Sequence, residues 1–218
     1  MRVGRAAPWM SEAASRKKRR SYWLKQLHLW HWVSSAMCLI GLLLFTVTGV
    51  TLNHASEIEG RPIVATREAR LPAPLGSALT NGPQKGKAAV PSGVADWIGK
   101  ELGIDIAGRE AEWSAAELYV SLPRAGGDAW LTIARDTGDI TYERTDRGWI
   151  SYLNDLHKGR NTGAAWRWFI DVFAAACLVF SLTGLVLLQL HSHNRPSTWP
   201  LVGLGLLAPV LLILLFMH

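Results

Sequence analysis

Three long apolar runs separated by polar stretches dominate the hydrophobic pattern of the chain. They cover roughly residues 32–52, 166–190 and 198–217. Each run is long enough to cross a ~30 Å hydrocarbon layer as a helix that rises ~1.5 Å per residue. We therefore predict three transmembrane helices, the last two of which are joined by a short turn over residues 191–197.

Residues 53–165, between the first two runs, predict a small α+β domain. Their first part, residues 55–90, is rich in Pro, Gly, Ala and Lys, which indicates a linker or a long loop. Apolar residues at helical spacing then predict a helix from a Ser92 cap to about Gly103. Four alternating segments predict strands near residues 110–113, 117–122, 129–134 and 140–144. A short helix starting near Asp146 leads into the second apolar run.

Composition and charge place the chain in a membrane. Of its 218 residues 49% are hydrophobic and only 18% are charged. Residues 1–31 read as a basic tail, disordered up to Arg20, followed by an interfacial segment. Residues 1–32 hold eight Lys or Arg and one acid, a net +7, whereas residues 53–165 carry a net −2. The positive-inside bias then predicts a cytoplasmic N-terminus, with the middle domain and the C-terminus on the opposite side. The main partner is the lipid bilayer, and nucleic acid is disfavoured.

Six of the seven histidines lie at the ends of apolar runs, where an unpartnered imidazole is costly. The predicted topology sorts them into two layers, with His28, His31, His191 and His193 on the cytoplasmic side and His54 and His157 on the outer side. Imidazole is an axial ligand of haem iron, and each layer could supply two imidazoles from different helices. One or two haem b groups could be held in this way. Alternatively, these side chains are interfacial residues that reach to the headgroups.

A short motif occurs in both of the first two apolar runs. Residues 45–49, Phe-Thr-Val-Thr-Gly, match residues 180–184, Phe-Ser-Leu-Thr-Gly. The two helices run in opposite directions, so the repeat is inverted in the membrane. Gly49 and Gly184 could give room to a flat ligand, or they could serve close helix packing. Arg160, near His157, could hold haem propionates or contact a lipid headgroup.

Two histidine-bearing segments look like the PepSY-associated transmembrane family. They are Gln-Leu-His-Leu-Trp-His-Trp at 26–32 and Asn-Asp-Leu-His-Lys-Gly-Arg at 154–160. The middle domain, with Ala-Arg-Asp-Thr-Gly-Asp-Ile at 134–140, resembles a PepSY domain. Members of that family include bacterial inner-membrane reductases for ferric siderophores, in which membrane histidines bind b-type haem. The resemblance implies axial ligation of haem iron by His28 or His31, His54, His157 and His191.

The residues and the resemblance leave two functional hypotheses. In the first, the chain is an inner-membrane haem protein that passes electrons to a periplasmic ferric siderophore or protein acceptor. It would act as a ferric reductase or as an electron-transfer subunit, with a homodimer to complete the haem bundle. In the second, it is a membrane-anchored PepSY interaction or regulatory module without redox chemistry. The chain is shorter than the larger reductases and has three predicted spans where they have four or more.

Overall fold

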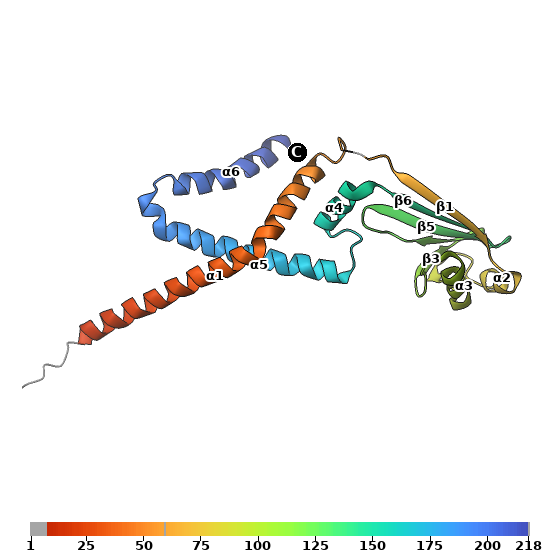
Figure 1. Cartoon of the computed structure of the whole chain (residues 1–218), viewed down its shortest axis with the longest axis horizontal. Coiled ribbons are helices and arrows are strands. Elements are labelled where there is room, and N and C mark those ends of the chain that lie inside the picture. The colour runs from red at the N-terminus through yellow and green to blue at the C-terminus, as the bar shows by residue number, and fades with distance from the viewer. Residues whose placement is uncertain (1–7, 59, 218) are drawn as a thin grey trace, which may run out of the picture. The chain divides into compact units, whose positions relative to one another are not determined.

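A computed structural model describes residues 8–58 and 60–217 of the chain. It divides into two compact units, residues 1–44 with 168–218 and residues 45–167. Three helical segments are long and apolar enough to cross a membrane: Ala14–Asn53, Ala164–Asn194 and Thr198–Phe216. They lie in helices α1 (Pro8–Asn53), α5 (Ala164–His191) and α6 (Thr198–Phe216) (Figure 1). The predicted fold class, three membrane helices with a small sheet domain between the first two, is confirmed.

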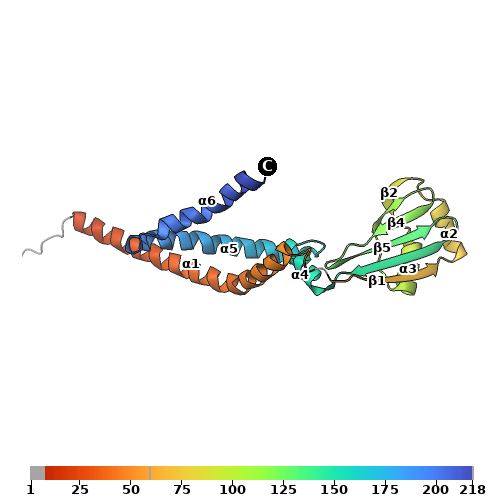
Figure 2. The ribbon, with the colours of Figure 1, turned by 90° about the horizontal axis from the view of Figure 1, so that it is seen from above.

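The sheet domain contains one antiparallel sheet of six strands in the order β1-β6-β5-β4-β3-β2 (Figure 2). Its strands are β1 (Ile63–Arg70), β2 (Gly86–Ala89), β3 (Glu110–Trp113), β4 (Glu117–Ser121), β5 (Gly127–Ala134) and β6 (Asp139–Asp146). Two helices accompany the sheet, α2 (Ala73–Thr80) and α3 (Ser92–Leu102). The four strands predicted from alternation correspond to β3 to β6.

The core of this domain lies between the sheet and the two helices. Alternate residues of β4 and β5 point to it, and Leu118, Leu131 and Ile133 are fully buried there. From α3, Val94 and Ile98 are also fully buried, because residues four apart lie on the same helix face. Burial of such side chains stabilises the domain by roughly 1.5–3 kcal/mol each.

Arg135 fixes the loop after α2 to the sheet. Its guanidinium donates to the carbonyl oxygen of Leu79 from both Nε and Nη2, at 3.1 and 2.9 Å, and to that of Ser114 at 2.7 Å. It also lies 5.4 Å from the centre of the Trp113 ring. The carbonyls satisfy a guanidinium that is only 9% exposed, which accounts structurally for one charged residue of the PepSY-like segment.

The remaining helix, α4 (Gly148–Lys158), follows β6 and precedes α5. Gly159 ends it in the left-handed conformation with φ 65°, which glycine adopts without steric cost. A short 3-10 turn over residues 192–194 joins α5 to α6. Pro209 lies inside α6, where the residue cannot donate a backbone hydrogen bond.

Three expectations from the sequence are wrong. Of the predicted disordered tail at 1–20, residues 8–20 instead continue the α1 helix toward the N-terminus, and residues 1–7 lie outside the described residues. Residues 55–90 are not a linker, since they hold β1, α2 and β2. Ser92 is the first residue of α3 rather than its cap, and the cap position is occupied by Pro91. Strands β1 and β2 have a weak apolar pattern of their own, and their structure comes from pairing with β6 and β3.

Candidate functional site: two imidazoles held by a repeated motif

One face of α1 packs against α5. The buried or half-buried residues on this face recur at spacings of three and four: Leu24, Leu27, His31, Ser34, Cys38 and Gly41. This spacing keeps them in one stripe along the helix, as in a coiled-coil seam. At its far end Gly41 accommodates the ring of Phe173 from α5, which a Cβ at that position would overlap. Small residues in the stripe therefore allow close approach of the two helices.

His31 lies within this contact and is surrounded by the repeated motif of α5. Its ring stacks on Phe180, with centroids 4.9 Å apart and planes inclined by 18°. Its Nδ1 lies 3.0 Å from Oγ1 of Thr183. A Cβ added to Gly184 would lie 3.3 Å from Cε1 of the imidazole, so the glycine makes room for the ring. We call His31, Phe180, Thr183 and Gly184 the His31 site.

The hydrogen bonds of Thr183 determine which nitrogen of His31 carries the proton. The hydroxyl donates within its own helix, with the carbonyl oxygens of Val179 and Phe180 at 2.7 and 3.0 Å. A hydroxyl has a single proton, so toward His31 its oxygen accepts. With the hydroxyl oriented in this way, Nδ1 of His31 donates to Thr183, and in a neutral ring the lone pair then lies on Nε2. This is the state of a histidine that binds iron through Nε2 while a second group holds its other nitrogen.

His31 and His191 line the same cavity, which has a volume of about 630 Å³. Gly184 and Arg195 line it as well. His191 also has a fixed ring nitrogen, because its Nδ1 lies 2.8 Å from the carbonyl oxygen of Leu187, which can only accept. The cavity is thus lined by two histidines from different helices and by one arginine. In both histidines Nδ1 is held by a hydrogen bond, and Nε2 is the other ring nitrogen.

His157 of α4 is surrounded by the copy of the motif in α1. Its Nδ1 lies 2.7 Å from Oγ1 of Thr48, and its ring lies 4.9 Å from that of Phe45 at an inclination of 49°. A Cβ on Gly49 would lie 3.6 Å from its Cε1. The hydroxyl of Thr48 also lies 3.3 Å from the carbonyl oxygen of Phe45, so its proton has two acceptors within reach, that carbonyl and Nδ1 of His157. We call His157, Phe45, Thr48 and Gly49 the His157 site.

Two buried neighbours of His157 connect α4 to the elements beside it. Oδ1 of Asn154 accepts from the hydroxyl of Thr51 in α1 at 2.8 Å. Oδ2 of Asp155 accepts from the backbone N–H of Gly126, in the turn before β5, at 2.9 Å. The Asn-Asp-Leu-His segment therefore ties α4 to α1 on one side and to the sheet on the other.

The other candidate residues have different surroundings. His28 and His54 are exposed, and each places Nδ1 against the carbonyl oxygen one turn earlier in α1, at 2.7 and 3.1 Å. Arg160 is exposed, and its backbone N–H donates to the carbonyl oxygen of Asp155. His193 is exposed in the turn after α5. Gly49 and Gly184 make room for imidazole rings.

The threonine hydroxyls that contact the two imidazoles were not predicted from the sequence. Thr48 and Thr183 belong to a repeat that was interpreted through its small residues, although the same repeat also carries a phenylalanine and a threonine at matching positions. The repeat itself was the available signal. Arg195 was assigned only to a short turn, and its approach to the cavity depends on how η1 (Ser192–Asn194) follows α5.

The described residues include no cluster of three or more His, Cys, Asp or Glu side chains suited to a metal ion. Haem iron requires only two axial ligands from the protein, so two imidazoles at one cavity fit it. The cavity volume also falls within the roughly 300–1,000 Å³ range of ligand pockets. His31 and His191 are therefore the residues that could hold haem iron at this cavity, and Arg195 is the cation among its lining residues.

The fold and the two histidine sites define a membrane protein in which an antiparallel sheet domain is inserted between the first two of three candidate spans. The chain belongs to the family described as "Putative PepSY_TM-like", whose model matches residues 22–218. Comparison with the curated proteins and with the solved structures gave no significant match.

Proposed function

We propose that this protein binds haem b and transfers electrons in the bacterial inner membrane. The observation that carries the proposal is the cavity shared by His31 and His191, whose rings both have Nδ1 held and Nε2 available. When bound, haem supplies one-electron redox chemistry, and two imidazole ligands keep its iron six-coordinate. The proposed orientation places the basic N-terminus in the cytoplasm and the sheet domain in the periplasm.

The residues of the chain have separate roles in this proposal. His31 and His191 would hold the haem iron, and Thr183 would hold the Nδ1 proton of His31, which leaves Nε2 as its ligating atom. Arg195 would pair with a propionate, because a guanidinium matches a carboxylate in shape and charge. Leu187 and Leu188 line the same cavity and give it apolar wall area.

The His157 site extends the proposal to the other end of the membrane. His157 would provide one ligand for a second haem, and the other would come from His54 or from a second copy of the chain. Electrons would then cross to a periplasmic acceptor, for which a ferric siderophore is the candidate that follows from the family. His54 has Nδ1 against the carbonyl oxygen of Val50, as His191 has against that of Leu187, so Nε2 would be its ligating atom here.

Absorption spectroscopy of the detergent-purified chain tests the proposal. We expect a Soret band and, after reduction with dithionite, an α-band typical of six-coordinate haem b. Replacement of His31 by Gln or of His191 by Ala should remove the absorbance that belongs to this site. The matched controls are His28→Ala and His193→Ala, two exposed histidines near the same helix ends, which should leave the spectrum unchanged. A wild-type chain that has no Soret band after supply of haem would rule the proposal out.

A second function is favoured by the edge of the sheet. β1 is the outermost strand, and Ile63 and Val64 on it are 72% and 54% exposed. An exposed edge strand can pair with an extended segment of another protein. The sheet domain would then be an interaction module. Replacement of Val64 by Lys should abolish capture of such a partner by the full chain, whereas His31→Gln should not affect it.

A further inference from the structure

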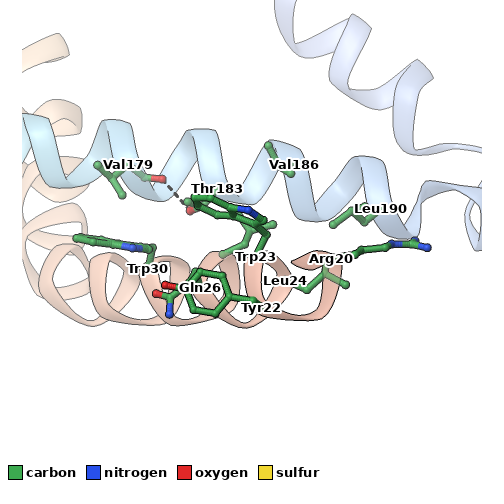
Figure 3. A pocket seen from close by; sticks show the side chains of 11 residues that line it. Arg20, Tyr22, Trp23, Leu24, Gln26, Trp30, Val179, Thr183, Val186 and Leu190 are labelled. Atoms are coloured by element: carbon green, nitrogen blue, oxygen red, sulfur yellow. Dashed lines mark hydrogen bonds between the residues drawn. The ribbon is translucent and has the colours of Figure 1, made fainter. Parts of the chain in front are cut away.

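A second cavity between α1 and α5 has a volume of about 560 Å³ and differs in character from the one beside His191. Leu24, Leu27 and Trp30 of α1 form one wall, and Val179, Val186 and Leu190 of α5 form the other. Figure 3 shows Trp23 near Thr183, Trp30 near Val179, and Arg20 at the end next to Leu190. We call this cavity the Arg20 groove.

The Arg20 groove is elongated along the helices. Residues Arg20 to Trp30 span roughly 15 Å at ~1.5 Å per residue, and they line the groove over that length. Trp23 and Trp30 are seven residues apart, so they share one face of α1 beside the stripe that meets α5, and both side chains are more than half exposed. Such a slot, long and walled by aliphatic and indole groups, suits an extended acyl chain better than a compact ligand.

A cationic side chain lies at one end of the groove, and other polar side chains lie along it. Arg20 closes the run of five basic residues at 16–20, and Tyr22 and Gln26 are the neighbouring lining residues with polar side chains. A guanidinium binds phosphate oxygens with two parallel hydrogen bonds, so Arg20 provides charge complementarity for a phosphodiester. Tryptophan and tyrosine beside basic residues are also typical of the headgroup level of a membrane.

We propose that the Arg20 groove binds one anionic phospholipid, with its phosphate on Arg20 and an acyl chain between Trp23 and Trp30. This inference is independent of haem binding. It has a consequence for the His31 site, because Thr183 lines the groove and also holds Nδ1 of His31. A bound acyl chain would pack against the residue that fixes the tautomer of His31.

Native mass spectrometry of the full chain tests this lipid site, with phosphatidylglycerol and phosphatidylcholine of identical acyl chains as the probes. We expect the wild type to retain phosphatidylglycerol about tenfold more than phosphatidylcholine, because both carry the phosphodiester but only phosphatidylcholine brings a choline cation beside Arg20. Arg20→Gln should remove this preference. Arg19→Gln is the matched control, since it removes the same charge from the same basic run at a position outside the groove lining, and it should keep the preference.

A second pair of variants tests the acyl part of the site. Val186→Trp should fill the groove and reduce retention of both lipids, whereas Leu185→Trp, on the same helix but outside the groove lining, should not. Equal loss of preference in Arg19→Gln and Arg20→Gln would overturn the proposal in favour of unspecific attraction. Displacement by glycerol phosphate alone, or by a neutral prenylated quinone at the same concentration as the lipid, would also overturn it.

Discussion

The His31 site and the His157 site combine the same four residue types, yet their surroundings differ. In both, an imidazole from one helix meets the Phe, Thr and Gly of the repeated motif in another. His31 also faces a cavity that holds His191 and Arg195, whereas His157 sits next to two buried polar residues that tie α4 to the sheet. The motif therefore holds an imidazole ring at both sites. The ring of His31 borders a cavity that a second imidazole also lines, whereas His157 lies among contacts that join α4 to the sheet domain.

Glycine substitutions should produce the largest effects, and they compare the two sites directly. Alanine at Gly41 would overlap the Phe173 ring, and we expect a loss of about 1–3 kcal/mol of stability. At Gly184 the added Cβ would lie 3.3 Å from the His31 ring, and at Gly49 it would lie 3.6 Å from that of His157. The expected order is Gly41→Ala, then Gly184→Ala, then Gly49→Ala, measured as thermal unfolding midpoints in detergent.

A reversed order would show that α1 and α5 do not pack through this face. Gly76→Ala is the control, because a Cβ at that position meets no atom within 4 Å. Its midpoint should remain at or slightly above that of the wild type, since alanine is the better helix former.

Removal of the Asp155 carboxylate should affect the surroundings of the His157 site and leave the His31 site unchanged. Asp155→Ala leaves the N–H of Gly126 without its buried partner, which costs about 1–3 kcal/mol. We expect faster amide exchange at the turn before β5 and in α4, and no change around His31. Asp105→Ala, which removes an exposed carboxylate that accepts from Ala107, is the control. Equal changes at both histidine sites would contradict the separation of their roles.

The elements that could be predicted from the sequence are those in which buried residues recur at the spacing of a helix or a strand. Helix α3 was predicted because Val94, Ile98 and Leu102 face one core, and β5 because its residues alternate between core and surface. Strand β1 was missed, since nearly all of its residues are exposed and its pairing partner β6 begins about 70 residues later in the chain. Its strand conformation comes from that pairing, which no local pattern records.

The histidines of the candidate sites were named from the sequence, but the threonines that contact them were not. The sequence pointed to His31, His157 and His191 because imidazoles at membrane boundaries need partners. The threonine partners of His31 and His157 are 152 and 109 positions away, so no spacing rule connects each histidine to its threonine. Only the inverted repeat linked the two sites in advance, and it could not tell that each copy of the motif holds a histidine from outside its own segment.

Loss of the threonine hydroxyls should have a smaller effect on stability than loss of the glycines. Thr183→Val and Thr48→Val keep the shape of the side chain and remove the hydroxyl that contacts Nδ1, at a cost of about 1 kcal/mol each. Nitrogen-15 spectra of the chain without haem should show His31 in the Nδ1-protonated form in the wild type and a tautomer mixture in Thr183→Val. Thr183→Ser should restore the wild-type spectrum. An unchanged spectrum in both valine variants would mean that packing against phenylalanine alone selects the tautomer.

The smallest expected effect is a pH dependence confined to the start of α4. The backbone N–H of Gly148 donates to the carboxylate of Asp146 at 2.9 Å, and with Arg124 and Arg144 nearby this lowers the pKa of Asp146. A lowered folded-state pKa means that the contribution to stability is present above the ordinary value of about 3.9 and is lost as pH falls through the folded value. The carboxylate is exposed, so solvent screens it and the change will be slight. The protection factor of the Gly148 amide should fall in this acid range in the wild type and stay constant in Asp146→Asn, while protection around His31 should not follow this titration in either protein.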